Sequence, residues 1–418
     1  MGLGSTIRET ASHLGAYLGE IAKVIGHADR VAPLRDYCAG LLVAPGRRSV
    51  EPLAAVTAPA NTRAQHQRLL HFVANSAWSD ERVLGKVREL VEPSITRREP
   101  IVAWIVDDTG IPKKGEHSVG VHHQYCGQLG KQANCQVAVT LSIANHHASL
   151  PIAHQLYLPQ EWIDDKERCK KVGVPPKTPF RTKPQLALEQ IRAAMEAGVS
   201  PGVILADGGY GVGSEFRFTL MEWGLTYVVG IGPTHMVRQV RAGKREPPRV
   251  SVKELALSLT KKAWRTVTWR QGTNIKLRSR FARVLVRTAP GQGKAFAEET
   301  LLIEWPKDEA EPTKYWLANI DEKMSLRELV DLAKMRWRIE RDYEELKQEV
   351  GLGHYEGRSW RGFHHHATLA IASYGFLISQ RGDFPPSGAR FSVELQKPSL
   401  PSGYRPRGSP DPDATSCS

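Results

Sequence analysis

Two short apolar segments, each followed at once by aspartate, constrain the fold of this chain more than any other feature. The first covers residues 101–106 and is followed by Asp107 and Asp108, and the second covers residues 203–206 and is followed by Asp207. Runs of this length and composition are typical of strands buried on both faces, which occur in sheets covered by helices. The two segments therefore predict an α/β core in which aspartates come directly after central strands.

The chain around these segments agrees with a mixed sheet. Strand composition with Gly, Asn and Pro in between predicts an antiparallel meander over residues 117–125, 136–145 and 152–158. The pattern of apolar residues then predicts, in order, a helix over 183–197, the strand over 203–206, a helix over 215–223 and a strand over 227–231.

Three regions follow from this pattern. Residues 1–97 form apolar helical stretches with short breaks, which predicts an all-helical domain. Its pair over 62–77 and 80–92 has the form of a DNA-binding helix-turn-helix or of a helical pair without DNA contact. Residues 98–382 hold the core, with a β-rich insertion at about 235–300, where the chain is basic and lacks helical periodicity. Residues 383–418 are rich in Pro, Ser and Gly, so we expect a disordered tail.

Composition narrows the class of protein. The formal net charge of +13 makes a polyanionic partner such as nucleic acid the first expectation, with a merely basic soluble enzyme as the alternative. No apolar run reaches the roughly 18 residues of a membrane span, and the N-terminus lacks a signal-peptide pattern, so we expect a soluble intracellular protein. The five cysteines form no Cys-x-x-Cys pair, which argues against a disulfide framework or a structural zinc site.

A third acid lies on a helix expected over residues 325–350. Ser325 and Glu328 form a capping-box pattern at its start, and glycines follow its end. Helical spacing places Glu340 in the apolar stripe, with Arg336 one turn before it and Lys347 two turns after it. This arrangement predicts either an ordinary salt bridge between Arg336 and Glu340 or a metal-binding carboxylate that meets the two strand-end aspartates.

The third motif resembles that of a known family. Arg336, Glu340 and Lys347 have the spacing of the Tyr-x2-Arg-x3-Glu-x6-Lys signature of bacterial insertion-sequence DDE transposases, although Ala333 stands at the Tyr position. The family's first motif is similar to Asp107 with Thr109 two residues later, which favours Asp107 over Asp108.

Further segments carry the same resemblance. The second family motif, an apolar strand followed by Asp, small residues and an aromatic, is similar to Asp207, Gly208, Gly209 and Tyr210. Residues 112–115 (Pro-Lys-Lys-Gly) and 121–127, which include Gln124, Tyr125 and Cys126, resemble one subgroup of the family.

The resemblance implies a fold and a reaction. The fold would be an RNase H-like mixed sheet with a β-rich insertion. Asp107, Asp207 and Glu340 would hold two Mg²⁺ or Mn²⁺ ions for phosphodiester chemistry. The protein would cleave double-stranded DNA at the terminal inverted repeats of its own element and catalyse strand transfer, as a homodimer in the bacterial cytoplasm.

The resemblance also suggests DNA contacts. They are Arg336, Lys347, Lys113, Lys114 and Trp316. Surface charge is the alternative for the basic residues. A position in a strand core is the alternative for Trp316.

Other functions remain open from the sequence. An inactive transposase-derived DNA-binding protein would have lost its acids, and another RNase H-like nuclease would lack the helix with Arg, Glu and Lys. A metabolic hydrolase with a basic surface is a third alternative, weakened by the absence of nucleophile-elbow, phosphate-loop and zinc-helix motifs. His122, His123 and the run of histidines at 364–366 have no acidic or Cys partner at metal-ligand spacing, so we expect them not to bind metal.

Overall fold

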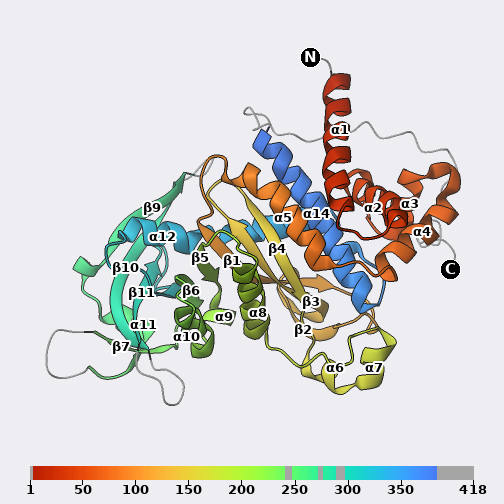
Figure 1. Ribbon diagram of the computed structural model, residues 1–418. Helices are drawn as coiled ribbons and strands as arrows, with labels where there is room; N and C mark the ends of the chain where they lie inside the picture. Colours follow the sequence, from red (N-terminus) through yellow and green to blue (C-terminus); the bar gives the residue numbers. More distant parts are fainter. Residues whose placement is uncertain (1–2, 241–246, 272–275, 289–296, 384–418) are drawn as a thin grey trace, which may run out of the picture. The chain divides into compact units, whose positions relative to one another are not determined.

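The computed structural model describes residues 3–240, 247–271, 276–288 and 297–383 (Figure 1). Met1–Asp383 cluster into one compact unit. The tail expected to be disordered falls in residues 384–418 and lies outside the described residues. No helix in the described part of the chain combines the length and apolar character needed to cross a membrane.

The N-terminal region is helical, as predicted. Its elements are α1 (Leu3–Ala22), η1 (Ala28–Arg30), α2 (Val31–Val43), α3 (Val50–Thr57), η2 (Pro59–Asn61), α4 (Thr62–Ala74) and α5 (Asp80–Thr96). Of these, α3 was not predicted.

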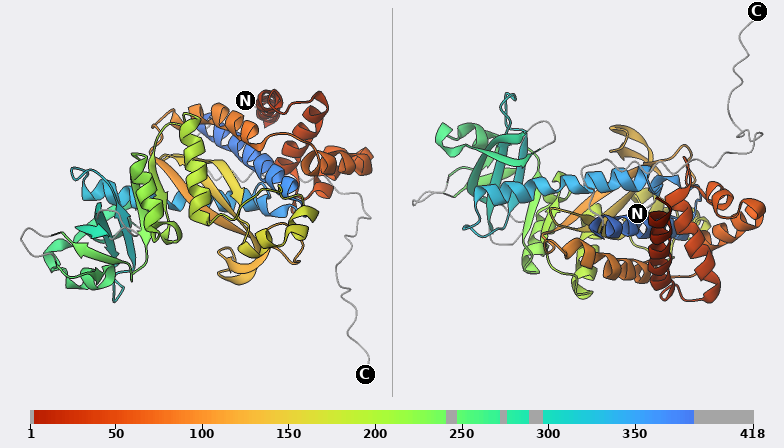
Figure 2. Two further views of the ribbon diagram at one scale, coloured as in Figure 1. Left: turned by 60° about the horizontal axis from the view of Figure 1, so that its bottom comes forward. Right: turned by 90° about the horizontal axis from the view of Figure 1, so that it is seen from above.

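The two helices of the expected helix-turn-helix are α4 and α5, but the Val83, Val87 and Val91 side chains of α5 are buried in the core. It packs along α14 (Trp360–Asp383) and on β4 (Ser149–Leu156), and the two helices lie side by side in Figures 1 and 2.

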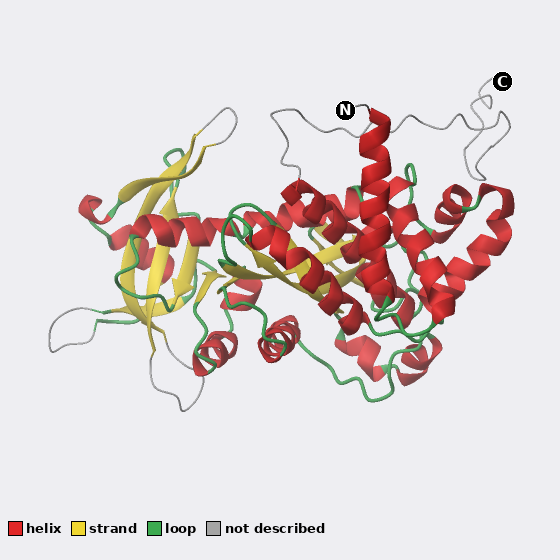
Figure 3. Ribbon diagram, turned by 45° about the horizontal axis from the view of Figure 1, so that its top comes forward, coloured by secondary structure: helices red, strands yellow, loops and turns green. Residues whose placement is uncertain are grey.

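The core is a mixed sheet with helices on its faces (Figure 3). Its strands are β1 (Ala103–Pro112), β2 (His122–Cys126), β3 (Lys131–Ala144), β4, β5 (Val203–Ala206) and β6 (Tyr227–Ile231). β1 runs antiparallel to β3 and parallel to β5, and β5 runs parallel to β6. β3 also pairs antiparallel with β2 and β4. This order confirms the predicted RNase H-like core.

Five helices connect the core strands. They are α6 (Gln160–Asp164), α7 (Lys166–Lys171), α8 (Lys183–Glu196), α9 (Gly208–Gly211) and α10 (Ser214–Glu222). A capping box formed by Thr182 and Gln185 begins α8, and its apolar face packs on β3.

The first strand is longer than the sequence predicted. It was expected to end at residue 106, but β1 continues to Pro112, so Asp107 lies inside the strand. The reason is tertiary. β3 pairs with β1 along its whole length, whereas pairing with β5 stops at Ile105. Beyond Ile105 one edge of β1 is therefore released from the parallel sheet, and Asp107 lies at this transition.

The β-rich insertion is present and extends further than predicted. It contains β7 (Met236–Gln239), β8 (Val250–Ser251), α11 (Val252–Ser258), η3 (Lys261–Ala263), β9 (Arg265–Gln271), β10 (Lys276–Thr288), β11 (Ala297–Trp305) and β12 (Lys314–Ala318). It was expected to end near residue 300. β12 pairs antiparallel with β6, so the insertion and the core share one twelve-stranded sheet. The strands of the insertion stand at the left of Figure 3.

The helix expected over 325–350 is divided in two. The structure has α12 (Leu326–Met335) and α13 (Trp337–Gln348), separated at Arg336 and followed by η4 (Leu352–His354). The predicted capping box at Ser325 is present. The prediction that Glu340 lies in the packing stripe is wrong, because Ile339 and Tyr343 take the buried positions and the Glu340 side chain is 64% exposed.

A buried ion pair joins the core to the insertion. Arg217 Nε on α10 lies 3.0 Å from Glu299 Oε1 on β11, and both side chains are almost completely buried. Tyr227 on β6 and Thr288 on β10 donate their hydroxyls to Glu299, and Arg217 donates to the carbonyl oxygen of Gly211. The Glu299 carboxylate of β11 thus joins α10, β6 and β10.

Removing this carboxylate should destabilise the whole unit. We expect Glu299→Ala to lower the free energy of unfolding by about 3–5 kcal/mol, because Arg217 would keep a buried charge without its partner. The neighbouring Glu298 is the matched control, since it pairs with Arg287 at the surface and Glu298→Ala should cost less than about 1 kcal/mol. Urea titrations of the three proteins measure both values. Equal effects would show that the buried pair does not join the two parts.

Candidate active site

Two of the three predicted acids contact the guanidinium group of Arg336. Its Nη1 lies 2.6 Å from Asp107 Oδ2, and its Nη2 lies 3.1 Å from Glu340 Oε1. Burial alone would lower the pKa of Arg336, but attraction by Asp107, Asp207 and Glu340 outweighs it and raises that pKa. Asp107 on β1 and Glu340 on α13 thus contact the same guanidinium group, and Asp207 at the start of α9 acts on it through electrostatic attraction.

Asp107 is the most confined of the three acids. Burial is the main reason that its pKa rises to about 7; Arg336 opposes this shift, while Asp207 and Asp108 add to it. A carboxylate in this position gains strongly from a nearby cation. In this conformation Arg336 supplies that cation.

Asp108 lies in a different environment from Asp107. Neighbouring residues of a strand point to opposite faces, and Asp108 Oδ2 lies 2.7 Å from Lys183 Nζ on α8. The hydroxyl of Tyr210 lies 3.4 Å from the other carboxylate oxygen. Asp108 thus has its own cation, while Asp107 faces Arg336. This geometry supports the choice of Asp107 that the motif favoured.

Asp207 is held by the first turn of α9. Its Oδ1 accepts a hydrogen bond of 2.8 Å from the backbone N of Gly209, as a helix N-cap does. The turn rests on Gly230 of β6, where an added Cβ would lie 2.9 Å from the backbone N of Gly208. An added Cβ at Gly211 would overlap the carbonyl oxygen of Gly230. The sequence drew attention to the glycines after Asp207 but missed Gly230, which is distant in sequence and has no motif.

The donor set fits a hard divalent cation in its chemistry. Three carboxylates offer the oxygen ligands that Mg²⁺ and Mn²⁺ prefer. In the conformation shown, the described residues contain no group of three His, Cys, Asp or Glu side chains arranged around one ion position. Arg336 instead contacts both Asp107 and Glu340, and the Glu340 side chain is exposed.

Two predicted DNA-binding lysines use their ammonium groups within the structure. Lys347 Nζ donates to the carbonyl oxygen of Gly110, 2.9 Å away on β1. Lys113 Nζ donates to the carbonyl oxygen of Tyr355, 2.7 Å away, and burial lowers the pKa of Lys113 to about 8. Lys114 is exposed.

Trp316 lies in the core of a strand, which is one of the two alternatives that the sequence left open. It lies in β12 with 9% of its surface exposed and packs among apolar side chains of the insertion and α12. The Lys334 ammonium lies 5.5 Å from its ring centroid. Since both faces of a buried ring have protein neighbours, Trp316 is not available to stack on a base in this conformation, and we do not retain it as a DNA contact.

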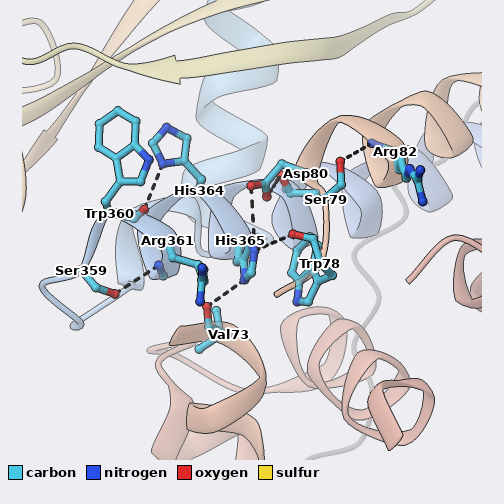
Figure 4. A network of polar contacts seen from close by, with 12 residues as sticks. Val73, Trp78, Ser79, Asp80, Arg82, Ser359, Trp360, Arg361, His364 and His365 are labelled. Atoms are coloured by element: carbon cyan, nitrogen blue, oxygen red, sulfur yellow. Dashed lines mark hydrogen bonds and ion pairs between the residues drawn. The ribbon is translucent and has the colours of Figure 1, made fainter. Parts of the chain in front are cut away.

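The histidines at 364–366 hold α14 against the rest of the protein. His364 Nε2 lies 3.4 Å from the backbone N of Leu156 on β4, and His366 bonds to Tyr37 and to the Gly351 carbonyl oxygen. Figure 4 shows His365, whose two ring nitrogens face the carbonyl oxygens of Val73 and Trp78 at 3.1 and 3.2 Å. These rings are engaged by other groups of the protein, and the expectation that they are not metal ligands stays a prediction.

Comparisons with known proteins agree with the predicted family. A family model described as DDE superfamily endonuclease matches residues 20–276, and one described as Transposase DDE domain matches residues 180–376. The probable transposase for insertion sequence element IS701 of Microchaete diplosiphon is 33% identical over 172 residues. That alignment covers 41% of this chain and 42% of the relative, so the chain spans less than half of the relative's length. The first matched range includes Asp107 and Asp207, and the second includes Asp207 and Glu340.

The buried histidines predict a specific dependence of stability on pH. Burial lowers the pKa of His364 from 6.5 to about 4. Between these values the unfolded chain binds a proton that the folded protein excludes, so stability is lost as pH falls from about 6.5 to 4. We expect His364→Gln to remove roughly 1.4 kcal/mol of this loss per pH unit.

The comparison with wild type isolates this effect. Burial raises the pKa of Asp80, Asp107 and Asp342 to about 7, and these groups contribute with the opposite sign in both proteins. The free energies of unfolding are measured in urea at several pH values, with the exposed His123→Gln as the control. A difference between His364→Gln and wild type that stays constant from pH 7 to pH 5 would contradict the prediction.

Proposed function

This chain belongs to the DDE superfamily of endonucleases, and we propose that it is a transposase that cleaves DNA at the ends of its own insertion sequence and transfers the freed strands. The proposal rests mainly on the contacts of Arg336 with both Asp107 and Glu340, close enough to Asp207 for that carboxylate to raise the pKa of Arg336 as well. The proposed substrate is double-stranded DNA that carries terminal inverted repeats. The proposed active form is a homodimer that pairs two such ends in the cytoplasm of a bacterium.

Each acid has a distinct part in this proposal. Asp107 offers a carboxylate from the rigid interior of β1, and Asp207 offers one from the N-cap of α9. Glu340 completes the set from the exposed side of α13. When bound there, two Mg²⁺ or Mn²⁺ ions would activate the attacking oxygen and stabilise the leaving oxygen of a phosphodiester.

Two basic residues have the positions needed to bind the phosphates next to the cut. Arg336 lies among the acids, and Lys347 lies two helical turns from Glu340 on α13. Both now contact protein oxygens, so in this proposal they exchange these contacts for phosphate when DNA binds. Exposed Lys114 adds positive charge near the end of β1.

Substitution of the acids tests the catalytic assignment. We expect Asp107→Ala, Asp207→Ala and Glu340→Ala each to reduce Mg²⁺-dependent cleavage of DNA carrying the element's ends to background. Asp108→Ala is the matched control and should still cleave, because Asp108 pairs with Lys183 away from Arg336. Normal cleavage by Glu340→Ala would refute the mechanism. If Asp108→Ala is inactive and Asp107→Ala is active, the first catalytic acid is Asp108 and the rest of the mechanism stands.

The position of Arg336 generates a separate prediction about metal binding. If this guanidinium occupies the place of a metal ion, Arg336→Gln should bind Mn²⁺ about tenfold more tightly in the absence of DNA, which corresponds to about 1.4 kcal/mol. The same change should weaken DNA cleavage, because a phosphate contact is lost. Titration calorimetry with Mn²⁺ measures the affinity.

The control for this experiment lies on the same helix. Arg341 pairs with Glu345 and is exposed, so Arg341→Gln removes a positive charge without touching the acids. Its Mn²⁺ affinity should equal that of wild type. Weaker Mn²⁺ binding by Arg336→Gln would show that Arg336 supports the metal site and does not compete with it.

A further inference from the structure

The hairpin of β2 and β3 contains a sequence motif that the proposed chemistry does not use. It includes Gln124, Tyr125 and Cys126, and its strands pair from His122 with Cys135 to Cys126 with Lys131. β1 pairs with β3 only from Cys135 onward. The Asn134 carbonyl oxygen still accepts a hydrogen bond from the backbone N of Lys113, 2.9 Å away. Residues 131–133 pair with β2 alone, so the hairpin extends past this contact as a short two-stranded ribbon. Figure 2 shows it projecting from the sheet.

The inner face of this hairpin is fixed beside the candidate active site. Cys126 and Cys135 pack with Val137, and an added Cβ at Gly110 would lie 3.0 Å from Cys126 Sγ. Gly110 follows Asp107 by three residues on β1, and its carbonyl oxygen accepts the hydrogen bond from Lys347. The lack of a side chain at Gly110 thus lets the hairpin lie against the strand that carries the first acid.

The outer face of the hairpin is polar and aromatic. His123 and Tyr125 alternate with inward residues along β2, and they stand opposite Asn134 and Gln132 of β3. Tyr125 is 61% exposed, and Leu129 in the turn is 44% exposed. Large side chains with this exposure on a projecting hairpin indicate a surface that another molecule covers.

The charge of the segment restricts what that molecule is. No Asp or Glu occurs between Glu116 and Glu161, so the hairpin lies in a stretch free of acids in a chain that contains 44 of them. Lys131 near the turn and Lys114 at the end of β1 are exposed. A hairpin without acidic residues, flanked by lysines, complements a polyanion.

We infer that the outer face of this hairpin enters the major groove of the DNA next to the cleavage site and contributes to recognition of the element's ends. A two-stranded ribbon fits this groove, and the amide of Gln132 presents a donor and an acceptor to a base edge. Tyr125 supplies an anchoring contact, and the lysines bind the adjacent phosphates. This inference rests on the proposed function, because it requires DNA at the acids.

The test compares two DNA duplexes and three proteins. One duplex is taken from the end of the genomic segment that carries the gene, and the other is an unrelated duplex of equal length. Fluorescence anisotropy in EDTA measures how tightly each protein binds each duplex. The proteins are wild type, the double variant Tyr125→Ala/Gln132→Ala, and Leu257→Ala, which removes an exposed apolar side chain from α11 in the insertion.

We expect the double variant to bind the end duplex at least about tenfold more weakly, since loss of a good base contact changes affinity by roughly this factor or more. Its binding to the unrelated duplex should change little, and Leu257→Ala should match wild type on both. Circular dichroism and the urea midpoint verify that the variants are folded; because the altered side chains are exposed, we expect no change in either.

Other outcomes separate the inference from the proposed function. If the double variant keeps full preference for the end duplex, the hairpin does not recognise DNA, while cleavage by wild type would leave the proposed function intact. Equal loss on both duplexes would overturn base recognition. If DNA binding is unchanged but the variant loses self-association in light scattering, the face contacts a second copy of the chain and the inference is wrong. Failure of wild type to cleave the end duplex with Mg²⁺ would refute the proposed function itself.

Discussion

Carboxylates that lie close together must be neutralised, and the arrangement around Arg336 follows from this constraint. Asp107 cannot move, because it lies in a strand paired along its length, and repulsion by Asp207 raises its pKa further. Arg336 lies at the junction of α12 and α13, and its guanidinium group reaches both Asp107 and Glu340. One side chain therefore joins the C-terminal helices to the central strand.

The second acid depends on contacts that reach across the sheet. The turn after Asp207 lies on Gly230 of β6, and β6 pairs with β12 of the insertion. The Gly211 carbonyl at the end of the same turn accepts from Arg217, which is held by Glu299 of the insertion. The insertion is thus part of the support for the site, although none of the three acids comes from it.

The sequence predicted those parts that local pattern determines. Apolar runs predicted β5 and β6 with their observed ends, and motif spacing selected Asp107 and Glu340, which both contact Arg336. The length of β1 was underestimated, because its second half is stabilised by pairing with β3 and not by its own composition. The break at Arg336 was missed, because the residues on both sides favour a helix. Burial of Trp316 and the role of Gly230 likewise depend on strand neighbours that the sequence does not reveal.

The shared twelve-stranded sheet also restricts how this chain could be shortened. Deleting β7 to β12 would leave β6 with a row of unpaired N–H and C=O groups along an apolar strand, since Tyr227, Val228 and Val229 are all buried. Such an edge pairs readily with other chains, and the carboxylate that neutralises Arg217 would be lost as well. We therefore expect a chain that lacks β7 to β12 to aggregate and not to form a smaller nuclease. The catalytic core and the insertion can then be kept or lost only together.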